Sequence, residues 1–199
     1  AQLARLAAAL PLTLPVVFDT QNIESDLVDE YGRSGRNFAV RTLAKLDVRP
    51  LRRVERWMAS RASVVGFVSE RDHSRAVGLG LIGRGTRVII VQNGFDEGLV
   101  RRDVNEGARR GVVFVGNLGW APNVDAACWL ALEVWPLVSR QRPDIELLLI
   151  GRGPHARVNA LASATVSVIP DVPSVEPFLS EAAVATAPLQ AAGGTRLKI

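Results

Sequence analysis

The sequence predicts an α/β protein made of two Rossmann-like domains, each built on a parallel sheet. Short runs rich in Val, Ile and Leu are nearly continuous rather than alternating, which is typical of parallel strands covered on both faces. They lie at 14–20, 63–69, 86–93, 111–116, 145–151, 164–169 and 183–189. Helical patterns separate them at 36–61, 70–78, 122–140, 154–162 and 173–181. Repeated alternation of strands and helices predicts this fold class.

A domain boundary is expected where this pattern is weakest. The segment "FDEGLVRRDVNEGARR" (95–110) has no strong period, two glycines and charges of both signs. We therefore expect a first domain at 1–97, a linker at 98–110 and a second domain at 111–199. We expect the first domain to be incomplete at its N-terminus and the second at its C-terminus.

Composition narrows the classes of partner. The 24 Lys and Arg residues exceed the 20 Asp and Glu residues by a net charge of +4, and lysine occurs only at Lys45 and Lys198. This excess is too mild for a nucleic-acid binder but suits an anionic small molecule or anionic lipid. Cys128 is the only cysteine, so no internal disulfide is possible. A lone cysteine favours a reducing compartment, and we expect a cytoplasmic protein, with a peripheral position on the inner face of the membrane as the alternative.

Glycine-rich or polar loops follow four of the predicted strands. "FVGNLGWAPN" places Gly116, Asn117 and Gly119 between a strand and a helix start, where glycine lets the backbone turn tightly and approach a ligand closely. "LLLIGRGPH" places Arg152 after the next strand. Because parallel strands end at one edge of their sheet, these loops predict a ligand site there. Each loop alone fits a structural turn equally well, with Arg152 a solvated side chain.

The two remaining loops extend this edge. "IPDVPSVEPF" carries Asp171 and Val172, and Asp171 or Ser174 is expected to cap the following helix. "APLQAAGGTRLKI" ends the chain with Gly193, Gly194, Arg196 and Lys198. Backbone N–H groups together with fixed cations can bind a diphosphate, although a surface turn with ordinary basic residues is the alternative.

Other patterns in the sequence give weaker evidence of a functional site. "GLGLIG" (78–83) matches a dinucleotide-binding pattern but follows a helix and precedes a strand, so a helix C-terminus is the better interpretation. "RPLRRVERWMASR" (49–61) predicts a basic amphipathic helix, suited to a membrane surface or to packing with a solvated basic face. The sequence contains no zinc-type spacing of cysteine and histidine and no nucleophile elbow, which argues against metalloenzymes and hydrolases.

Taken in order, "VVFVGNLGWAPNVDA", "VSVIPDVPSVEPFLSEAAVATAPL" and "GGTRLKI" resemble the donor-binding domain of the family 4 glycosyltransferases of the GT-B fold. "FDTQNIES", "ASVVGFVSERD" and "VQNGFD" look like the end of the acceptor-side domain of that family. The resemblance implies a hexosyltransferase-like enzyme of glycan or cell-envelope biosynthesis, of bacterial type. It implies transfer from a nucleotide-diphosphate sugar to a glycan, lipid-linked or small-molecule acceptor, with retention and without a metal or other cofactor.

The resemblance also implies roles by position. Gly116, Asn117 and Gly119 would approach the donor phosphate or sugar, and Asp171 and Val172 would lie near the nucleobase. Arg196 and Lys198 would neutralise the leaving diphosphate as the catalytic cations, supported by Gly193, Gly194 and Arg152.

Three positions depart from the family pattern. Gly193 stands where the first of two paired glutamates is usual, Gln21 stands where many members have histidine, and "NLGWAPN" lacks the usual basic residue. The alternative is therefore a non-catalytic sugar-nucleotide-binding module of GT-B ancestry; a GT-B epimerase fits the motifs less well. We expect this chain alone to be inactive.

Overall fold

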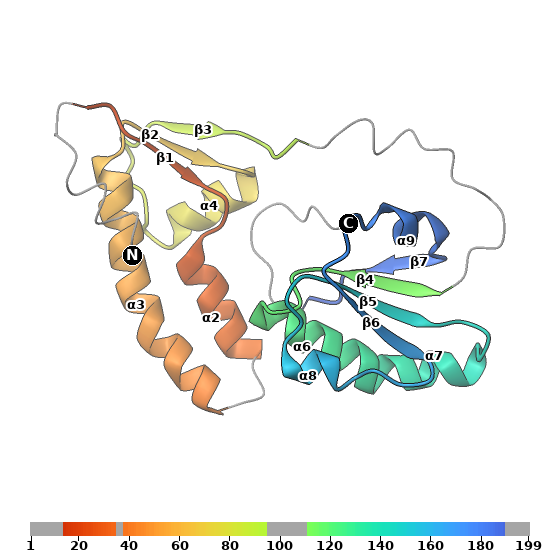
Figure 1. Cartoon of the computed structure of the whole chain (residues 1–199). Coiled ribbons are helices and arrows are strands. Elements are labelled where there is room, and N and C mark those ends of the chain that lie inside the picture. The colour runs from red at the N-terminus through yellow and green to blue at the C-terminus, as the bar shows by residue number, and fades with distance from the viewer. Residues whose placement is uncertain (1–13, 35–37, 95–110, 190–199) are drawn as a thin grey trace. The chain divides into compact units, whose positions relative to one another are not determined.

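The computed structural model describes residues 14–34, 38–94 and 111–189. These residues form two compact units, one up to residue 94 and the other from residue 111 to residue 189. We call them unit 1 and unit 2 (Figure 1). The linker expected at 98–110 and the loop at 190–199 lie outside the described residues.

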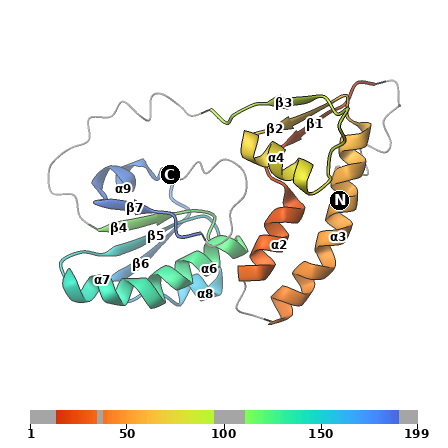
Figure 2. The same cartoon turned by 180° about the vertical axis from the view of Figure 1, so that it is seen from behind.

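Unit 1 contains a parallel sheet in the order β1-β2-β3, formed by Val17–Thr20, Val64–Phe67 and Val88–Ile90. Its helices are α2 (Glu24–Ser34), α3 (Phe38–Arg61) and α4 (Glu70–Gly78). Figures 1 and 2 show α2 and α3 side by side. A Cβ atom at Gly32 would lie 2.5 Å from the Cβ of Ala44, so glycine lets these helices approach closely.

The core of unit 1 joins its helices to the sheet. Val65 and Phe67 of β2 are almost fully buried, together with Ala59 of α3 and Ala76 of α4. The helix α4 begins after Ser69, whose Oγ accepts a hydrogen bond from Asp72 N at 3.1 Å. It ends at Gly78, and Gly80 follows with a φ of 63°, so "GLGLIG" is a helix end and not a dinucleotide loop.

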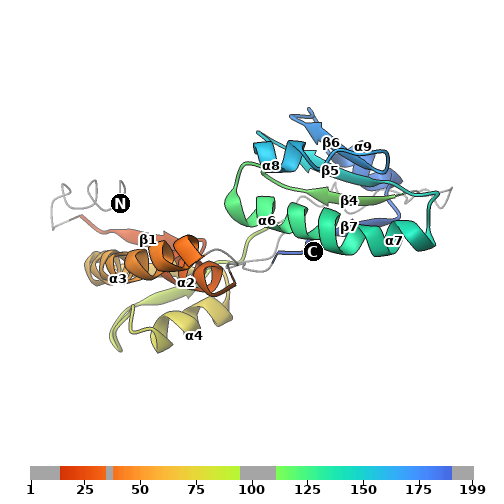
Figure 3. The ribbon, with the colours of Figure 1, turned by 90° about the horizontal axis from the view of Figure 1, so that it is seen from below.

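Unit 2 contains a parallel sheet in the order β6-β5-β4-β7. Its strands are β4 (Val112–Val115), β5 (Leu147–Gly151), β6 (Val166–Pro170) and β7 (Val184–Thr186). The helices are α6 (Ala121–Trp129), the π-helical turn η1 (Leu130–Val134), α7 (Trp135–Gln141), α8 (Ala156–Asn159) and α9 (Glu176–Glu181). Seen from below, α6, η1 and α7 follow one another along the sheet (Figure 3).

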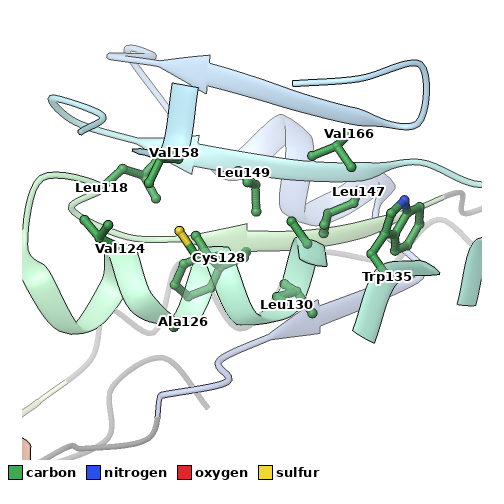
Figure 4. Close-up of a cluster of buried hydrophobic side chains, with 13 residues drawn as sticks. Leu118, Val124, Ala126, Cys128, Leu130, Trp135, Leu147, Leu149, Val158 and Val166 are labelled. Carbon is green, nitrogen blue, oxygen red and sulfur yellow. The ribbon is translucent and has the colours of Figure 1, made fainter. Parts of the chain in front are cut away.

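Both faces of this sheet are covered. On one face, Phe114, Leu147 and Leu149 pack against α6, α7 and α8, and Figure 4 shows Leu149 among Leu118, Val158 and Cys128. On the other face, Val113 and Ile150 pack against residues of α9 and of the loop before it. Burial on both faces explains why these strands read as continuous apolar runs in the sequence.

The helix predicted at 122–140 contains a π turn at its centre. Trp135 N donates to Leu130 O, five residues back, and Pro136 follows with no N–H to donate. The indole of Trp135 is buried and donates through Nε1 to Thr165 Oγ1 at 3.0 Å. The wide turn thus accommodates a proline without ending the helix.

Candidate functional site

The loops that follow β4, β5 and β6 lie at one edge of the unit 2 sheet, because these strands are parallel and paired in register. Gly116, Asn117 and Gly119 lie in the first loop, Arg152 in the second, and Asp171 and Val172 in the third. The structure therefore brings six of the predicted site residues to one edge. Gly193, Gly194, Arg196 and Lys198 lie outside the described residues.

Backbone hydrogen bonds join the first loop to the second. Gly116 N donates to Ile150 O at 2.9 Å, and Leu118 N donates to Arg152 O at 3.0 Å. His155 N donates in turn to Leu118 O at 3.1 Å. Leu118 itself is fully buried, so its side chain anchors the loop while its backbone ties it to the neighbouring strand end. The N–H of Gly116 is used within the fold, and its contact with a ligand stays a prediction.

Two glycines permit this close approach. A Cβ atom at Gly151 would lie 1.6 Å from Gly116 O, and a Cβ atom at Gly119 would lie 2.8 Å from Gly153 O. Real Cβ atoms do not approach a carbonyl oxygen so closely, and here the obstacle is backbone. The glycines thus bring two loop backbones into contact, which places their exposed polar groups next to each other.

The third loop is tied to the second by Asp171. Asp171 N donates to Gly151 O at 3.0 Å, and Asp171 Oδ1 accepts from Gly153 N at 3.1 Å. Asp171 adopts a φ of 51°, in the left-handed region that few non-glycine residues occupy. Of the two residues predicted to cap the next helix, Asp171 does not do so, because its carboxylate accepts a hydrogen bond from the neighbouring loop instead.

Ser174 partly takes the role predicted for the helix start. Its Oγ accepts a hydrogen bond from Glu176 N at 3.1 Å, although the residue at the N-cap of α9 is Val175. Val172 is half-buried and packs against the cluster that includes Val113 and Ile150. Its side chain thus belongs to the core of the sheet's second face, and its contact with a nucleobase stays a prediction.

Asn117 shapes the first loop from within. Its Oδ1 accepts a hydrogen bond from Gly119 N at 3.0 Å, and its backbone oxygen accepts from Asn123 Nδ2 at 2.8 Å. Asn123 is only 2 % exposed and lies inside α6, so it supports the loop rather than capping the helix. The N-cap of α6 is Trp120, which has no side-chain capping bond.

The exposed arginines at this edge differ in whether their guanidinium group has a partner. Arg152 is exposed, and within the described ranges no hydrogen bond or ion pair of its guanidinium is found. Arg157, in contrast, donates from Nη1 to Asp125 Oδ1 at 2.8 Å. A fixed backbone with a nearby free guanidinium is an arrangement that can receive an anion.

Sequence reasoning missed two residues of this edge. Trp120 is 42 % exposed directly after Gly119, and an exposed indole beside a glycine loop offers a flat apolar surface to a ligand. His155 belongs to no zinc-type spacing, yet its Nδ1 accepts a hydrogen bond from Arg157 N at 3.1 Å and its N–H donates to Leu118 O. Their positions directly within the glycine loops were the available signal.

The described residues contain no group of three or more His, Cys, Asp or Glu side chains able to hold a metal ion. In the same ranges no helix combines the length and apolar character needed to cross a bilayer. Burial in the core raises the pKa of the Cys128 thiol above its ordinary value.

One family model matches the second part of the chain. Residues 109–199 match the model of the family described as "Glycosyl transferases group 1". The match covers unit 2, and the resemblance of this part of the sequence to glycosyltransferases is confirmed. No curated protein sequence matches the chain.

Solved structures of low sequence identity share the fold. The sucrose-phosphate synthase from Thermosynechococcus elongatus matches with a TM-score of 0.64 at 13 % identity, over 97 % of this chain and 48 % of that one. An alpha,alpha-trehalose-phosphate synthase (UDP-forming) from Burkholderia vietnamiensis matches with a TM-score of 0.58 at 12 % identity, over 98 % of this chain and 58 % of that one. The GT-B fold class is thus confirmed, and the chain spans about half the length of these relatives.

Proposed function

We propose that the loops after β4, β5 and β6 bind the nucleotide-diphosphate part of a sugar donor, and that the protein is a glycosyltransferase. The observation that carries this proposal is the direct hydrogen bonding of the three loops. Leu118 N reaches Arg152 O, and Asp171 N and Oδ1 reach the second loop. Binding a flexible diphosphate is favoured when the receiving backbone is already in place, because little ordering is left for the ligand to drive.

The chemistry we propose is transfer with retention and without a metal. As the bond between sugar and diphosphate breaks, negative charge grows on the leaving phosphate, and donors already in position stabilise it. Arg152 supplies one exposed guanidinium at this edge, and Arg196 and Lys198 are proposed to supply the remaining positive charge. The N-terminus of α6 adds a favourable dipole beyond the end of β4. The donor is a substrate, and no resident cofactor is part of the proposal.

The finer assignments belong to the same proposal. The trehalose-phosphate synthases that share the fold are described as UDP-forming, so UDP is the first nucleotide to test. We propose a hexosyltransferase that acts on a glycan, lipid-linked or small-molecule acceptor in cell-envelope glycan synthesis in a bacterium. We place it in the cytoplasm, with a peripheral contact at the inner face of the membrane.

A second candidate is a sugar-nucleotide-binding module without activity. It is favoured by Gln21, which is exposed and donates from Nε2 to Asp19 Oδ2 at 3.1 Å, and by Gly193 in the position of a usual glutamate. Both candidates bind the nucleotide, so they are separated by turnover. Transfer from a UDP-sugar by the full-length protein supports the enzyme, and tight binding without transfer supports the module.

Titration calorimetry with UDP and GDP tests the binding site common to both candidates. Arg196→Ala with Lys198→Ala should weaken nucleotide binding at least about tenfold, because two charge-assisted contacts are lost. Arg71→Ala with Arg84→Ala, two exposed arginines of unit 1, removes the same charge and should leave the affinity unchanged. An unchanged affinity in the first pair would refute the assigned role, and the absence of any nucleotide binding would refute both candidates.

A further inference from the structure

The helix α3 exposes apolar side chains on the side away from its own core. Ala44, Val48 and Ala59 are buried and mark the inner side. Leu43 and Leu46 are 61 % and 66 % exposed, and they precede Pro50 and Trp57 at helical spacing on the outer side. A soluble helix face normally carries polar residues at such positions, so this stripe needs an explanation.

A row of cations runs beside this apolar stripe. Arg41, Lys45, Arg49 and Arg53 follow one another four residues apart, so they align along one side of the helix over about 18 Å. All four are exposed, and in the described residues no hydrogen bond or ion pair of their side chains is found. The row is therefore positive charge that no described carboxylate neutralises.

The structure changes which residues form the basic side predicted from the sequence. Arg52 lies 3.6 Å (Nη2 to Oδ2) from Asp29 of α2, and Arg56 Nε donates to Gly80 O at 2.8 Å. These two arginines therefore have partners within unit 1. Arg61 lies over the ring of Trp57, with 5.3 Å from Cζ to the ring centroid. Among the described residues, the cations without such partners are Arg49 and Arg53, together with Arg41 and Lys45 in the preceding turns of the helix.

We propose that this side of α3, formed by Leu43, Leu46, Pro50 and Trp57 with the four-residue cation row, binds the surface of an anionic lipid bilayer. The apolar stripe enters the headgroup region while the cations meet lipid phosphates. A second copy of the chain fits less well, because a twofold contact would place two positive rows on the same interface. This inference rests on the peripheral membrane contact proposed above and assigns it to residues of unit 1, and its failure would leave the proposed nucleotide site of unit 2 unaffected.

The acidic residues of α3 agree with this geometry. The helix sequence contains Asp47 and Glu55 as its carboxylates. Glu55 faces the core and accepts a hydrogen bond from Ser25 N at 3.1 Å through Oε1. Asp47 falls on the far side of the apolar stripe from the cation row, so neither interrupts the basic row.

The test is sedimentation of the chain with lipid vesicles. Vesicles containing about one third phosphatidylglycerol should bind the chain, vesicles of pure phosphatidylcholine should bind it far more weakly, and salt should weaken binding to the anionic vesicles. Arg49→Ala with Arg53→Ala should lower the partition coefficient about 25-fold, since each cation near an anionic surface contributes about fivefold. The matched control is Arg71→Ala with Arg84→Ala, exposed arginines of the same unit with equal charge.

Three results would overturn the proposal. Equal binding to both kinds of vesicle would show that charge plays no part. An equal loss in the control pair would show that net charge, and not α3, carries the binding. The surface would be assigned to a second copy of the chain if the chain did not bind vesicles and formed dimers that the double variant Leu43→Ser with Leu46→Ser dissociates.

A spectroscopic measurement keeps the proposal testable if a double variant folds poorly. A nitroxide attached through Leu46→Cys, in a Cys128→Ala background, should gain collision with oxygen and lose collision with a polar nickel complex when anionic vesicles are added. The same label attached through Ser74→Cys, on exposed α4, should show no such change. A label at residue 46 that stays water-exposed on bound vesicles would refute the assignment.

Discussion

The two units end their parallel strands in different ways. In unit 2 the ends of β4, β5 and β6 are joined through the backbone, as in the bond from Leu118 N to Arg152 O. In unit 1 a backbone bond from Val91 N to Phe67 O joins the ends of β3 and β2, whereas the end of β1 is joined to β2 by a side chain, since Thr20 Oγ1 donates to Gly66 O at 2.8 Å. Backbone bonding defines loop shape independently of rotamers, so the unit 2 edge is the better preformed of the two.

The strands that lead into these loops also differ between the units, in how deeply their residues are buried. In β5 four of five residues are buried, whereas β1 alternates exposed and half-buried positions along Val17–Thr20. The unit 2 sheet has a core cluster on each face, one around Leu149 and one around Ile150. A strand held on both faces cannot shift without opening a cavity, and a loop that begins there inherits its position.

Gly151→Ala should give the largest effect, because the new Cβ would lie 1.6 Å from Gly116 O and would separate the two loops. We expect a loss of about 4 kcal/mol in the free energy of unfolding of unit 2, measured by denaturant titration. Gly153→Ala is the matched control two residues on: it has a φ of 51° but no heavy atom within 4 Å of the new Cβ. It should cost only about 1 kcal/mol. Equal losses would mean that loop contact is not the cause.

Leu149→Ala compares the strands themselves. Leu149 is fully buried in β5, and its truncation should cost about 3 kcal/mol through lost burial and the cavity left behind. Ile89 of β3 is 44 % exposed, and Ile89→Ala should cost less than about 1 kcal/mol. Both are read from urea unfolding. Similar losses at the two sites would contradict the difference in strand burial between the units.

Glu24→Gln in unit 1 should give the smallest change in stability of the substitutions compared here. Burial, and then the charge of Glu55, raises the pKa of Glu24 above its ordinary value of 4.5. The folded state therefore binds the proton more tightly, so stability falls as pH rises from that value through the raised pKa. Because the carboxyl group of Glu24 is only partly shielded and the residue stays in contact with solvent, the gain from Glu24→Gln at neutral pH should be below about 1 kcal/mol. Thermal unfolding at pH 7 should show it, and a gain that persists well below the ordinary pKa would contradict this cause.

Most strands were predictable because burial leaves a direct trace in composition. Each of the seven predicted apolar runs overlaps a strand that is shorter than the run, and only β6 (Val166–Pro170) extends past its predicted end, by one residue. The helix α2 was not predicted, since its sequence is polar and contains Gly32, and only its contact with Ala44 explains that glycine. Two helices are shorter than predicted, since α8 covers only Ala156–Asn159 of the expected 154–162 and α9 only Glu176–Glu181 of the expected 173–181.

The sequence by itself determined the fold class, the gathering of the glycine loops at one sheet edge and the resemblance to glycosyltransferases, because hydrophobic pattern and loop residues are local properties. Only the tertiary structure decided what each polar residue does. Asp171 holds a loop instead of capping a helix. Arg52 pairs with Asp29 and Arg56 donates to Gly80 O, and both partners are distant in the sequence. A hydrogen bond depends on which atoms lie close together after folding, and these partners are distant in the sequence, so the neighbouring residues do not reveal them.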